Sequence, residues 1–364
     1  MSLVFRLALA WVIVFALDAA LFRTGWYLRR LQPDSSTANI ERLIRIEREK
    51  LAVARPSSLP YQVVSVGDSR MGFFMRFANQ RWGGEGFRFG SLVLGGSLPR
   101  CWPYLLRAVD PDAANYAAIL IPLNDFDDLA TEEELAGRAS DLHYLSGQLR
   151  IGDLTEFAGS YPDWLDRWKA ARAILFKGFA YKRDVQEFIE APQVRLDKVK
   201  LYQEWEQWTY NYEGEQRSLT GLEIDRKTRT AKYPPGVPDD VRLLIERFLL
   251  PPPFPPSPVT TNYRLKWLGK IVERYRGTRT RLIFLRLPRG PIPPDEPLPA
   301  PNPASSVRQF AREPHVTLID EHFFDVLERR ELFMDPLHLN RPGFERFSIL
   351  LADEVHRILT AAKR

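Results

Sequence analysis

The sequence predicts an α/β protein whose core is a parallel β-sheet. Short runs of β-branched and apolar residues, suited to strands buried on both faces, recur along the chain. Segments with apolar residues at helical spacing separate several of these runs. Glycine or asparagine follows each of the first three runs, as expected where a strand meets a turn. This alternation favours right-handed crossovers between parallel strands.

Five strands are expected, and we place them at 61–66, 87–94, 117–123, 281–287 and 315–320. The accompanying helices are expected at 71–82, 99–109, 262–276 and from Pro342 onward. The α/β rhythm breaks between 129 and 258, where the chain is charged, aromatic and helical in patches. This segment is interpreted as a large, mainly helical insertion.

The expected organisation has three parts. Residues 1–30 form a membrane anchor, 31–58 a stalk or linker with a helix at 39–53, and 59–364 the main domain with its insertion at 129–258. Within the insertion, 203–217 is dense in aromatic and polar groups. Such a stretch either binds sugars by ring stacking or packs as the core of a helical segment.

The N-terminus carries an apolar segment. Residues 3–22 have the length, roughly 20 residues, that a helix needs to cross a bilayer. Asp18 occupies the outer position of the nearest cleavage-like site, which favours an uncleaved anchor over a cleaved signal peptide. By the positive-inside rule the arginines that follow the segment would leave the main body in the cytoplasm. They are Arg23, Arg29 and Arg30.

Charge and cysteine content exclude several classes. The 51 basic and 46 acidic residues are mixed throughout, so a nucleic-acid partner is not expected. Cys101 is the only cysteine, which excludes an intrachain disulfide and a multi-cysteine metal site. We expect it to be a small buried residue. Histidine and carboxylate spacing does not indicate a metal site, and no cofactor is expected.

A candidate nucleophile follows the first strand. The chain reads Gly67-Asp68-Ser69 and then continues into a segment with helical spacing. A serine presented there has its own N–H and a helix N-terminus facing the place where negative charge would develop. The same three residues also suit an ordinary strand-to-helix turn.

A candidate base precedes the last helix. Asp335 and His338 are three residues apart, so the carboxylate can bind one imidazole nitrogen while the other takes a proton from a serine. In isolation this pair also suits a helix N-terminal turn. His322, close to Asp320 and Asp325, is the rival base.

Two further blocks complete an ordered set. Gly95-Gly96 follows the second strand and Asn124 follows the third, between Ser69 and His338 in the chain. This order resembles the SGNH (GDSL-type) hydrolase superfamily, whose four conserved blocks supply Ser, Gly, Asn and His. The resemblance covers about 60–125 and 280–360. It implies a three-layer α/β/α sandwich with a flavodoxin-like, five-stranded parallel sheet.

The resemblance also implies roles. Ser69 would be the nucleophile, His338 the general base and then acid, and Asp335 its orienting partner. The oxyanion hole would be the Ser69 N–H, the Gly95 or Gly96 N–H with Gly95 preferred, and the Asn124 side chain. The first block lacks the leucine of the GDSL name, and the third block reads Pro-Leu-Asn-Asp instead of Gly-x-Asn-Asp. The second departure bears on the backbone beside Asn124.

The acidic loop after the third strand has no role in the resemblance. Its carboxylates are expected to be solvated, with one possible substrate contact at the pocket rim. They are Asp125, Asp127 and Asp128.

The chemistry implied is acyl transfer through a serine ester. If water accepts the acyl group, the chain is an esterase and therefore a hydrolase. If a sugar hydroxyl accepts it, the chain is an O-acyltransferase. An anchor ahead of such a domain resembles bacterial cell-envelope proteins such as the alginate-type acetyltransferases and the teichoic acid D-alanylation proteins. That implies a glycan substrate, an integral-membrane acyltransferase partner, and a single-pass inner-membrane protein with a periplasmic domain. The flanking arginines indicate the opposite orientation.

Two other readings stay open. One is a catalytically silent SGNH-fold protein that binds or scaffolds an envelope polymer or an acyltransferase partner. The other is an intracellular lipase.

Overall fold

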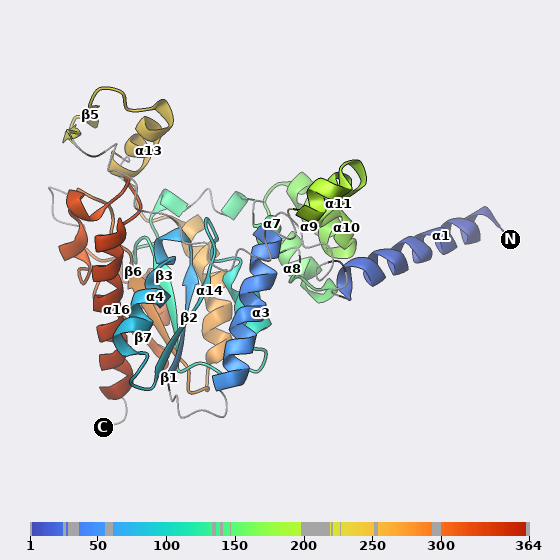
Figure 1. The fold of residues 1–364 in the computed structure, drawn as a ribbon, viewed down its shortest axis with the longest axis horizontal. Helices are drawn as coiled ribbons and strands as arrows, with labels where there is room; N and C mark the ends of the chain where they lie inside the picture. Colours follow the sequence, from blue (N-terminus) through green and yellow to red (C-terminus); the bar gives the residue numbers. More distant parts are fainter. Residues whose placement is uncertain are drawn as a thin grey trace. The chain divides into compact units, whose positions relative to one another are not determined.

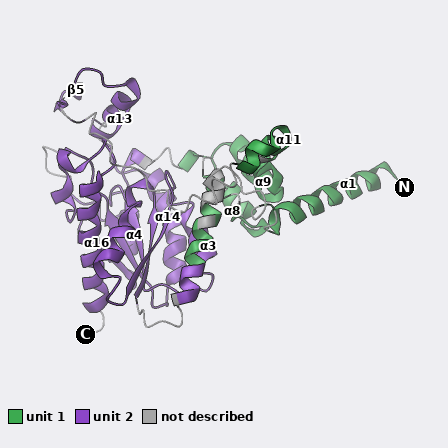
Figure 2. Cartoon of the chain, in the orientation of Figure 1, with its two compact units in different colours: residues 1–48, 134–209 green, residues 49–133, 210–364 purple. Residues whose placement is uncertain are grey.

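The chain forms two compact units (Figure 2). Unit 1 is 1–48 with 134–209, and unit 2 is 49–133 with 210–364. The sequence-based divisions group the chain differently, because 134–209 of the expected insertion joins unit 1, whereas 129–133 and 210–258 join unit 2. A computed structural model describes residues 2–24, 27, 36–54, 61–132, 136–138, 141–145, 147–197, 219, 221–225, 227–250, 254–292 and 300–361.

Unit 2 is built on a five-stranded parallel sheet, which confirms the predicted α/β class (Figure 1). Its order is β2-β1-β3-β6-β7. The strands are β1 (Tyr61–Gly67), β2 (Phe87–Val93), β3 (Ala118–Leu123), β6 (Arg281–Arg286) and β7 (Val316–Leu318). Their interiors are almost wholly buried, as continuous apolar runs require.

The direction of strand addition reverses between β1 and β3. From β1 the chain adds β2 on one side, and then adds β3, β6 and β7 on the other. Backbone pairing continues just past the strand ends, with Leu94 N donating to Gly67 O (3.0 Å) and Leu287 N to Leu123 O (2.9 Å). In parallel sheets, ligands bind beside the carboxyl ends of strands at such a reversal.

One face of the sheet is covered by α4 (Phe74–Trp82) and α16 (Arg341–Ala361), which pack against each other (Figure 1). Leu120, Ile283 and Phe347 belong to the apolar core between these helices and the strands. The alternation of side chains along a strand sends the neighbours of these residues to the opposite face.

The second face receives helices from two distant parts of unit 2. Helix α14 (Pro258–Tyr275) packs on β6, on α5 (Trp102–Val109) and on α15 (Ser306–Phe310). Phe284 of β6 stacks with Phe310 of α15, their ring centroids 6.1 Å apart. The helices expected at 99–109 and 262–276 are therefore present with shifted ends.

The expected insertion is not helical throughout. It includes an antiparallel hairpin, β4 (Glu223–Asp225) with β5 (Thr230–Lys232), followed by α13 (Asp239–Leu249). Ile245 and Leu249 of α13 join the core that contains α4 and α16. The aromatic stretch 203–217 lies outside the described residues, and so do Arg29 and Arg30.

Unit 1 is helical in its described part. Its elements are α1 (Leu3–Asp18) with a π-helical continuation at Ala19–Arg23, α3 (Ser36–Ala54) up to residue 48, α7 (Leu142–Leu145), α8 (Leu154–Ala158), α9 (Trp164–Leu175), α10 (Lys177–Ala180) and α11 (Lys182–Glu190). The 21-residue helix Leu3–Arg23 is long and apolar enough to cross a membrane, and its most apolar stretch is exposed. Helix α3 buries Ile40 and Ile44, the apolar stripe expected within 39–53.

Candidate active site

Ser69 follows a turn that requires glycine. Gly67 ends β1 with φ +134°, and a Cβ there would lie 2.7 Å from Pro122 Cγ and 3.2 Å from Met71 Cγ. Ser69 then begins a three-residue 3₁₀ turn, Ser69–Met71. Helix α4 starts only at Phe74, so the expectation that an α-helix begins beside the serine is wrong. An α-helix N-terminus therefore does not begin at Ser69 itself.

The 3₁₀ turn is capped by its own neighbours. Asp68 Oδ1 accepts from Arg70 N (3.0 Å), and Arg70 Nη2 donates to Asp68 Oδ2 (2.7 Å). Burial raises the pKa of Asp68, but the charge and hydrogen bonds of Arg70 outweigh it and leave that pKa below its ordinary value. Asp68 therefore stays ionised and holds Arg70 along the flank of Ser69.

Ser69, His338 and Asp335 form a hydrogen-bonded series. Ser69 Oγ lies 2.8 Å from His338 Nε2, and His338 Nδ1 lies 2.8 Å from Asp335 Oδ2. A proton on Nδ1 donates to the carboxylate and leaves the Nε2 lone pair to accept from the Ser69 hydroxyl. The structure thus joins three residues that the sequence places at two separate sites.

The second oxygen of Asp335 holds the turn itself. Asp335 Oδ1 accepts from Leu337 N and His338 N, both at 2.7 Å. Burial raises the pKa of Asp335, yet the hydrogen bond and charge of His338 and the backbone donors lower it further, so the net pKa is below its ordinary value. The carboxylate is ionised at neutral pH and fixes both the ring and its loop.

The loop that carries His338 is tied to α16. Met334 N donates to His338 O (2.9 Å), and Asn340 N donates to Leu332 O (2.9 Å). Asn340 Oδ1 accepts from Gly343 N (3.0 Å) at the start of α16. A helix that packs one face on the sheet therefore sets the position of the base.

His322 does not occupy this position. Its Nδ1 lies 2.8 Å from Asp325 Oδ2, and its side chain is 60% exposed. His315 is buried with Nε2 3.0 Å from Val272 O, and His356 stacks on Trp82. The histidine that reaches Ser69 is His338.

The loop after β2 is fastened to the end of β1. Ser97 Oγ donates to Gly67 O (2.7 Å) and accepts from Trp102 Nε1 (3.1 Å). Gly95 is partly buried and Gly96 is exposed with φ +74°. The role of either N–H as an oxyanion donor stays a prediction. Ser97 was missed by sequence reasoning, although it directly follows the glycine pair.

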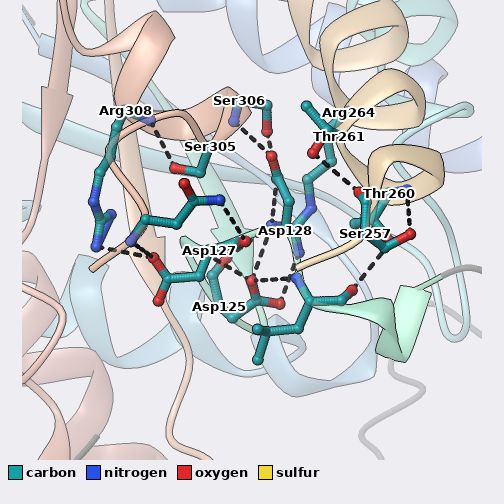
Figure 3. A network of polar contacts seen from close by, with 12 residues as sticks. Asp125, Asp127, Asp128, Ser257, Thr260, Thr261, Arg264, Ser305, Ser306 and Arg308 are labelled. Atoms are coloured by element: carbon teal, nitrogen blue, oxygen red, sulfur yellow. Dashed lines mark hydrogen bonds and ion pairs between the residues drawn. The ribbon is translucent and has the colours of Figure 1, made fainter. Parts of the chain in front are cut away.

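Asn124 directly follows β3 and is exposed at its carboxyl end. The acidic loop beyond it is anchored by Arg264 of α14, whose side chain is fully buried (Figure 3). Arg264 Nη2 donates to Asp125 Oδ2 (3.0 Å), and its Nη1 donates to Asp128 Oδ1 (3.1 Å). The expectation that Asp125 and Asp128 are solvated is therefore wrong.

Asp128 also binds α15. Its Oδ2 accepts from Ser306 N and its Oδ1 from Ser306 Oγ, both at 2.6 Å (Figure 3). Asp127 Oδ1 accepts from Asn302 N (2.8 Å) and pairs with Arg308 (3.3 Å). The loop after Asn124 is thus held by contacts to α14 and α15, and the predicted substrate contact of one of its carboxylates stays a prediction.

Among the residues that the structure describes, no group of three or more His, Cys, Asp or Glu side chains is placed to hold a metal ion. Cys101 is buried, as predicted.

No family model matches the chain, and no curated protein matches it. A function therefore has to follow from the geometry around Ser69.

Proposed function

We propose that the chain is a serine-dependent acyl-transfer enzyme of the SGNH type, working through an acyl ester on Ser69. The observation that carries this proposal is the hydrogen-bonded series from Ser69 Oγ through His338 to Asp335, with 2.8 Å at each step. A nucleophile, a base within hydrogen-bond reach and a third group that orients the base are the parts that such catalysis requires.

The proposed chemistry has two halves. His338 Nε2 takes the Ser69 proton as Oγ attacks an ester carbonyl, and His338 then returns that proton to the leaving alkoxide as the ester bond breaks. In the second half His338 activates an acceptor hydroxyl, which attacks the acyl-serine and releases Ser69. Water as acceptor gives an O-acylesterase, and a sugar hydroxyl gives an O-acyltransferase. Asp335 stays ionised and stabilises the imidazolium.

The proposed oxyanion hole consists of the Ser69 N–H, the Gly95 N–H and the Asn124 side chain. Supporting observations are that all three follow the carboxyl ends of adjacent strands and that Ser97 fastens the Gly95 loop to Gly67. Pro122, the departure from the family's third block, packs against Gly67. It therefore shapes the turn before Ser69 as well as the backbone leading to Asn124.

We extend the proposal to the fold family. The strand order and the helices packed on either side of β6 are consistent with a flavodoxin-like α/β/α sandwich. Among the arrangements that a parallel sheet allows, this one puts the reversal of strand order at the site of Ser69 and Asn124.

The proposed setting is the bacterial inner membrane. The apolar helix Leu3–Arg23 would be a single-pass anchor, with its N-terminus in the cytoplasm and the catalytic unit in the periplasm facing an envelope glycan. Arg23 counts against this orientation by charge, but it donates to Ile174 O and Leu175 O inside unit 1 and so has a structural role as well. Protection of the C-terminus from protease in spheroplasts would contradict the periplasmic assignment.

A serine-directed fluorophosphonate probe tests the chemistry. The wild-type protein should be labelled, and Ser69→Ala and His338→Ala should not. His322→Ala should be labelled as strongly as wild type, because His322 binds Asp325 and does not contact Ser69. Folded wild type that resists the probe would favour the silent, polymer-binding reading. If labelling succeeds, acetate release from acetylated glycan against transfer to a glycan hydroxyl separates esterase from transferase.

A further inference from the structure

Helix α9 in unit 1 carries large apolar side chains that are exposed to solvent. Trp164 is 72% exposed, Trp168 is 53% exposed and the intervening Leu165 is 46% exposed. The two tryptophans are four residues apart, so they share one face of the helix with Arg172. Two adjacent exposed tryptophans are unusual unless the surface binds something.

This face continues onto the apolar N-terminal helix. The Arg172 guanidinium lies 4.9 Å from the Phe179 ring centroid, and Phe179 packs edge-on to Phe176 at 6.2 Å. Phe176 in turn contacts Trp11 at 5.8 Å and Phe15 at 5.9 Å on α1. A series of contacts therefore leads from Arg172 on α9, through Phe179 and Phe176, to the helix that is long and apolar enough to cross a membrane.

Polar contacts fix the end of that helix to the same corner. Asp18 accepts from Lys177 N (2.9 Å) and Gly178 N (2.7 Å) at the start of α10. Arg23 Nη2 donates to Ile174 O (2.6 Å) and Leu175 O (2.8 Å) at the end of α9. The corner between α9 and α10 is thereby held where the apolar helix ends.

The position of Phe176 indicates how deep this corner sits. Its contacts on α1, Phe15 and Trp11, precede Asp18 by roughly 5 and 10 Å along the helix axis at 1.5 Å per residue. A bilayer spanned by α1 would therefore reach the corner, and α9 would emerge from it at headgroup level.

We propose that the α9 face formed by Trp164, Trp168 and Arg172 lies in the headgroup region of the bilayer that α1 spans. Tryptophan favours this region because its ring is apolar and its N–H can bind water or headgroups, and arginine can snorkel. Helix α9 carries one acidic and three basic side chains, which suits anionic lipid. This proposal rests on α1 crossing a membrane and not on the chemistry of Ser69.

Lipid fits this surface better than a sugar does. The hollow between α8 and α9 is bordered by Trp164, Trp168 and small or aliphatic residues, and its polar side chains are those of Thr155 and Arg167. Sugar sites combine a stacking ring with several hydrogen-bond partners for the hydroxyls. The hollow offers two aromatic rings but few hydrogen-bond partners. Lipid acyl chains need no hydrogen-bond partners, so they suit this hollow better than sugar hydroxyls do.

Depth-dependent quenching in vesicles tests the proposal on the full chain. Cysteine is introduced by Trp168→Cys, or by Trp164→Cys as a second position, in a Cys101→Ser background, and is labelled with an environment-sensitive dye. Vesicles contain phosphatidylcholine, phosphatidylglycerol and a lipid with a nitroxide near the headgroup. A matched label at exposed Arg45 on α3 of the same unit serves as the water reference. Both tryptophan positions are exposed, so their replacement removes little packing.

The dye at 168 and at 164 should be quenched several-fold more strongly than the dye at 45, with a depth about 5–10 Å below the headgroup surface. Quenching no stronger than at position 45 would overturn the proposal. So would a dye at 168 that ignores the nitroxide lipid but responds to soluble envelope glycan, since that outcome assigns the surface to sugar. Ser69 labelling by fluorophosphonate in the same vesicles is read separately, so loss of one result leaves the other interpretable.

Discussion

Ser69 Oγ and His338 Nε2 lie 2.8 Å apart, although the two residues are separated by 269 positions in the chain. Each approaches the other from a different element of unit 2, the turn after β1 and the loop before α16. Because both elements pack on the same sheet, the contact depends on the whole unit being folded. Three predictions concern that contact and its surroundings, and a fourth concerns a buried lysine in unit 1.

Replacing the orienting carboxylate should slow the chemistry while preserving the fold. In Asp335→Asn the amide can still accept from Leu337 N, but it no longer holds the His338 ring with Nδ1 protonated or balances an imidazolium. We expect fluorophosphonate labelling to slow by a factor on the order of 10³–10⁴, with circular dichroism unchanged. A labelling rate equal to wild type would show that Ser69 reacts independently of Asp335.

Adding one methyl group at Gly67 should disturb the serine turn. Gly67→Ala combines a φ of +134° with a Cβ 2.7 Å from Pro122 Cγ. We expect a loss of about 1–3 kcal/mol in the free energy of unfolding from the strained backbone, together with reduced labelling of Ser69. Denaturant unfolding measures the first effect. Gly84→Ala is the matched control, because nothing lies within 4 Å of a Cβ at that position and stability should change little.

Removing the buried arginine of α14 should release the loop after Asn124. Arg264→Met leaves Asp125 and Asp128 without their cation, and both carboxylates are largely or fully buried. We expect a loss of about 3–5 kcal/mol in the free energy of unfolding. Arg264→Lys should recover part of this loss, because lysine keeps the positive charge. The recovery should be incomplete, because lysine lacks the forked donors of arginine.

Lys232→Ala is the control for the Arg264 variants. It breaks a solvent-exposed ion pair with Glu223. The Lys232 side chain is 77% exposed and the Glu223 side chain is 70% exposed. A change within about 0–1 kcal/mol is expected there. If Arg264→Met were as mild as this control, the network in Figure 3 would not be what holds the loop.

Unit 1 should become more stable as the pH rises above neutrality, because of one buried lysine. Burial first, and then the nearby charge of Arg23, lower the pKa of Lys177 from 10.5 to about 7, against the opposing pull of Asp153, Asp18 and Glu41. Between those two values the unfolded chain binds more protons at this site than the folded chain, so the free energy of unfolding contributed by Lys177 increases with pH. The increase should level off above the ordinary value of 10.5.

Thermal unfolding in detergent between pH 6 and pH 10 would measure this effect. The Lys177→Met variant is the comparison, because it removes the titrating group and leaves the other groups of the chain in place. The stability of wild type should rise relative to that of Lys177→Met as the pH increases from 7 toward 10. A difference that stays constant across this range would show that Lys177 keeps an ordinary pKa.

The sequence by itself predicted the local features of this protein. Short apolar, β-branched runs such as Val63 to Val66 favour buried strands, and the five parallel strands are confirmed with ends shifted by one or two residues. The apolar N-terminal helix and the buried Cys101 also follow from local composition. Asp335 and His338 are near neighbours in the chain, so their pairing needed only a tight turn.

Tertiary structure alone decided the rest, because the decisive partners are distant in sequence. The sequence favoured His338 over its rival His322 through the family resemblance, and the contact of His338 with Ser69 depends on tertiary packing of α16 beside α4. Asp125 and Asp128 looked like solvated loop carboxylates until Arg264, 139 and 136 positions away, closed on them. Residues 134–209 join the N-terminal helix in one unit for the same reason. A short segment shows what a residue favours locally, and its burial and charge partners exist only once the chain has folded back on itself.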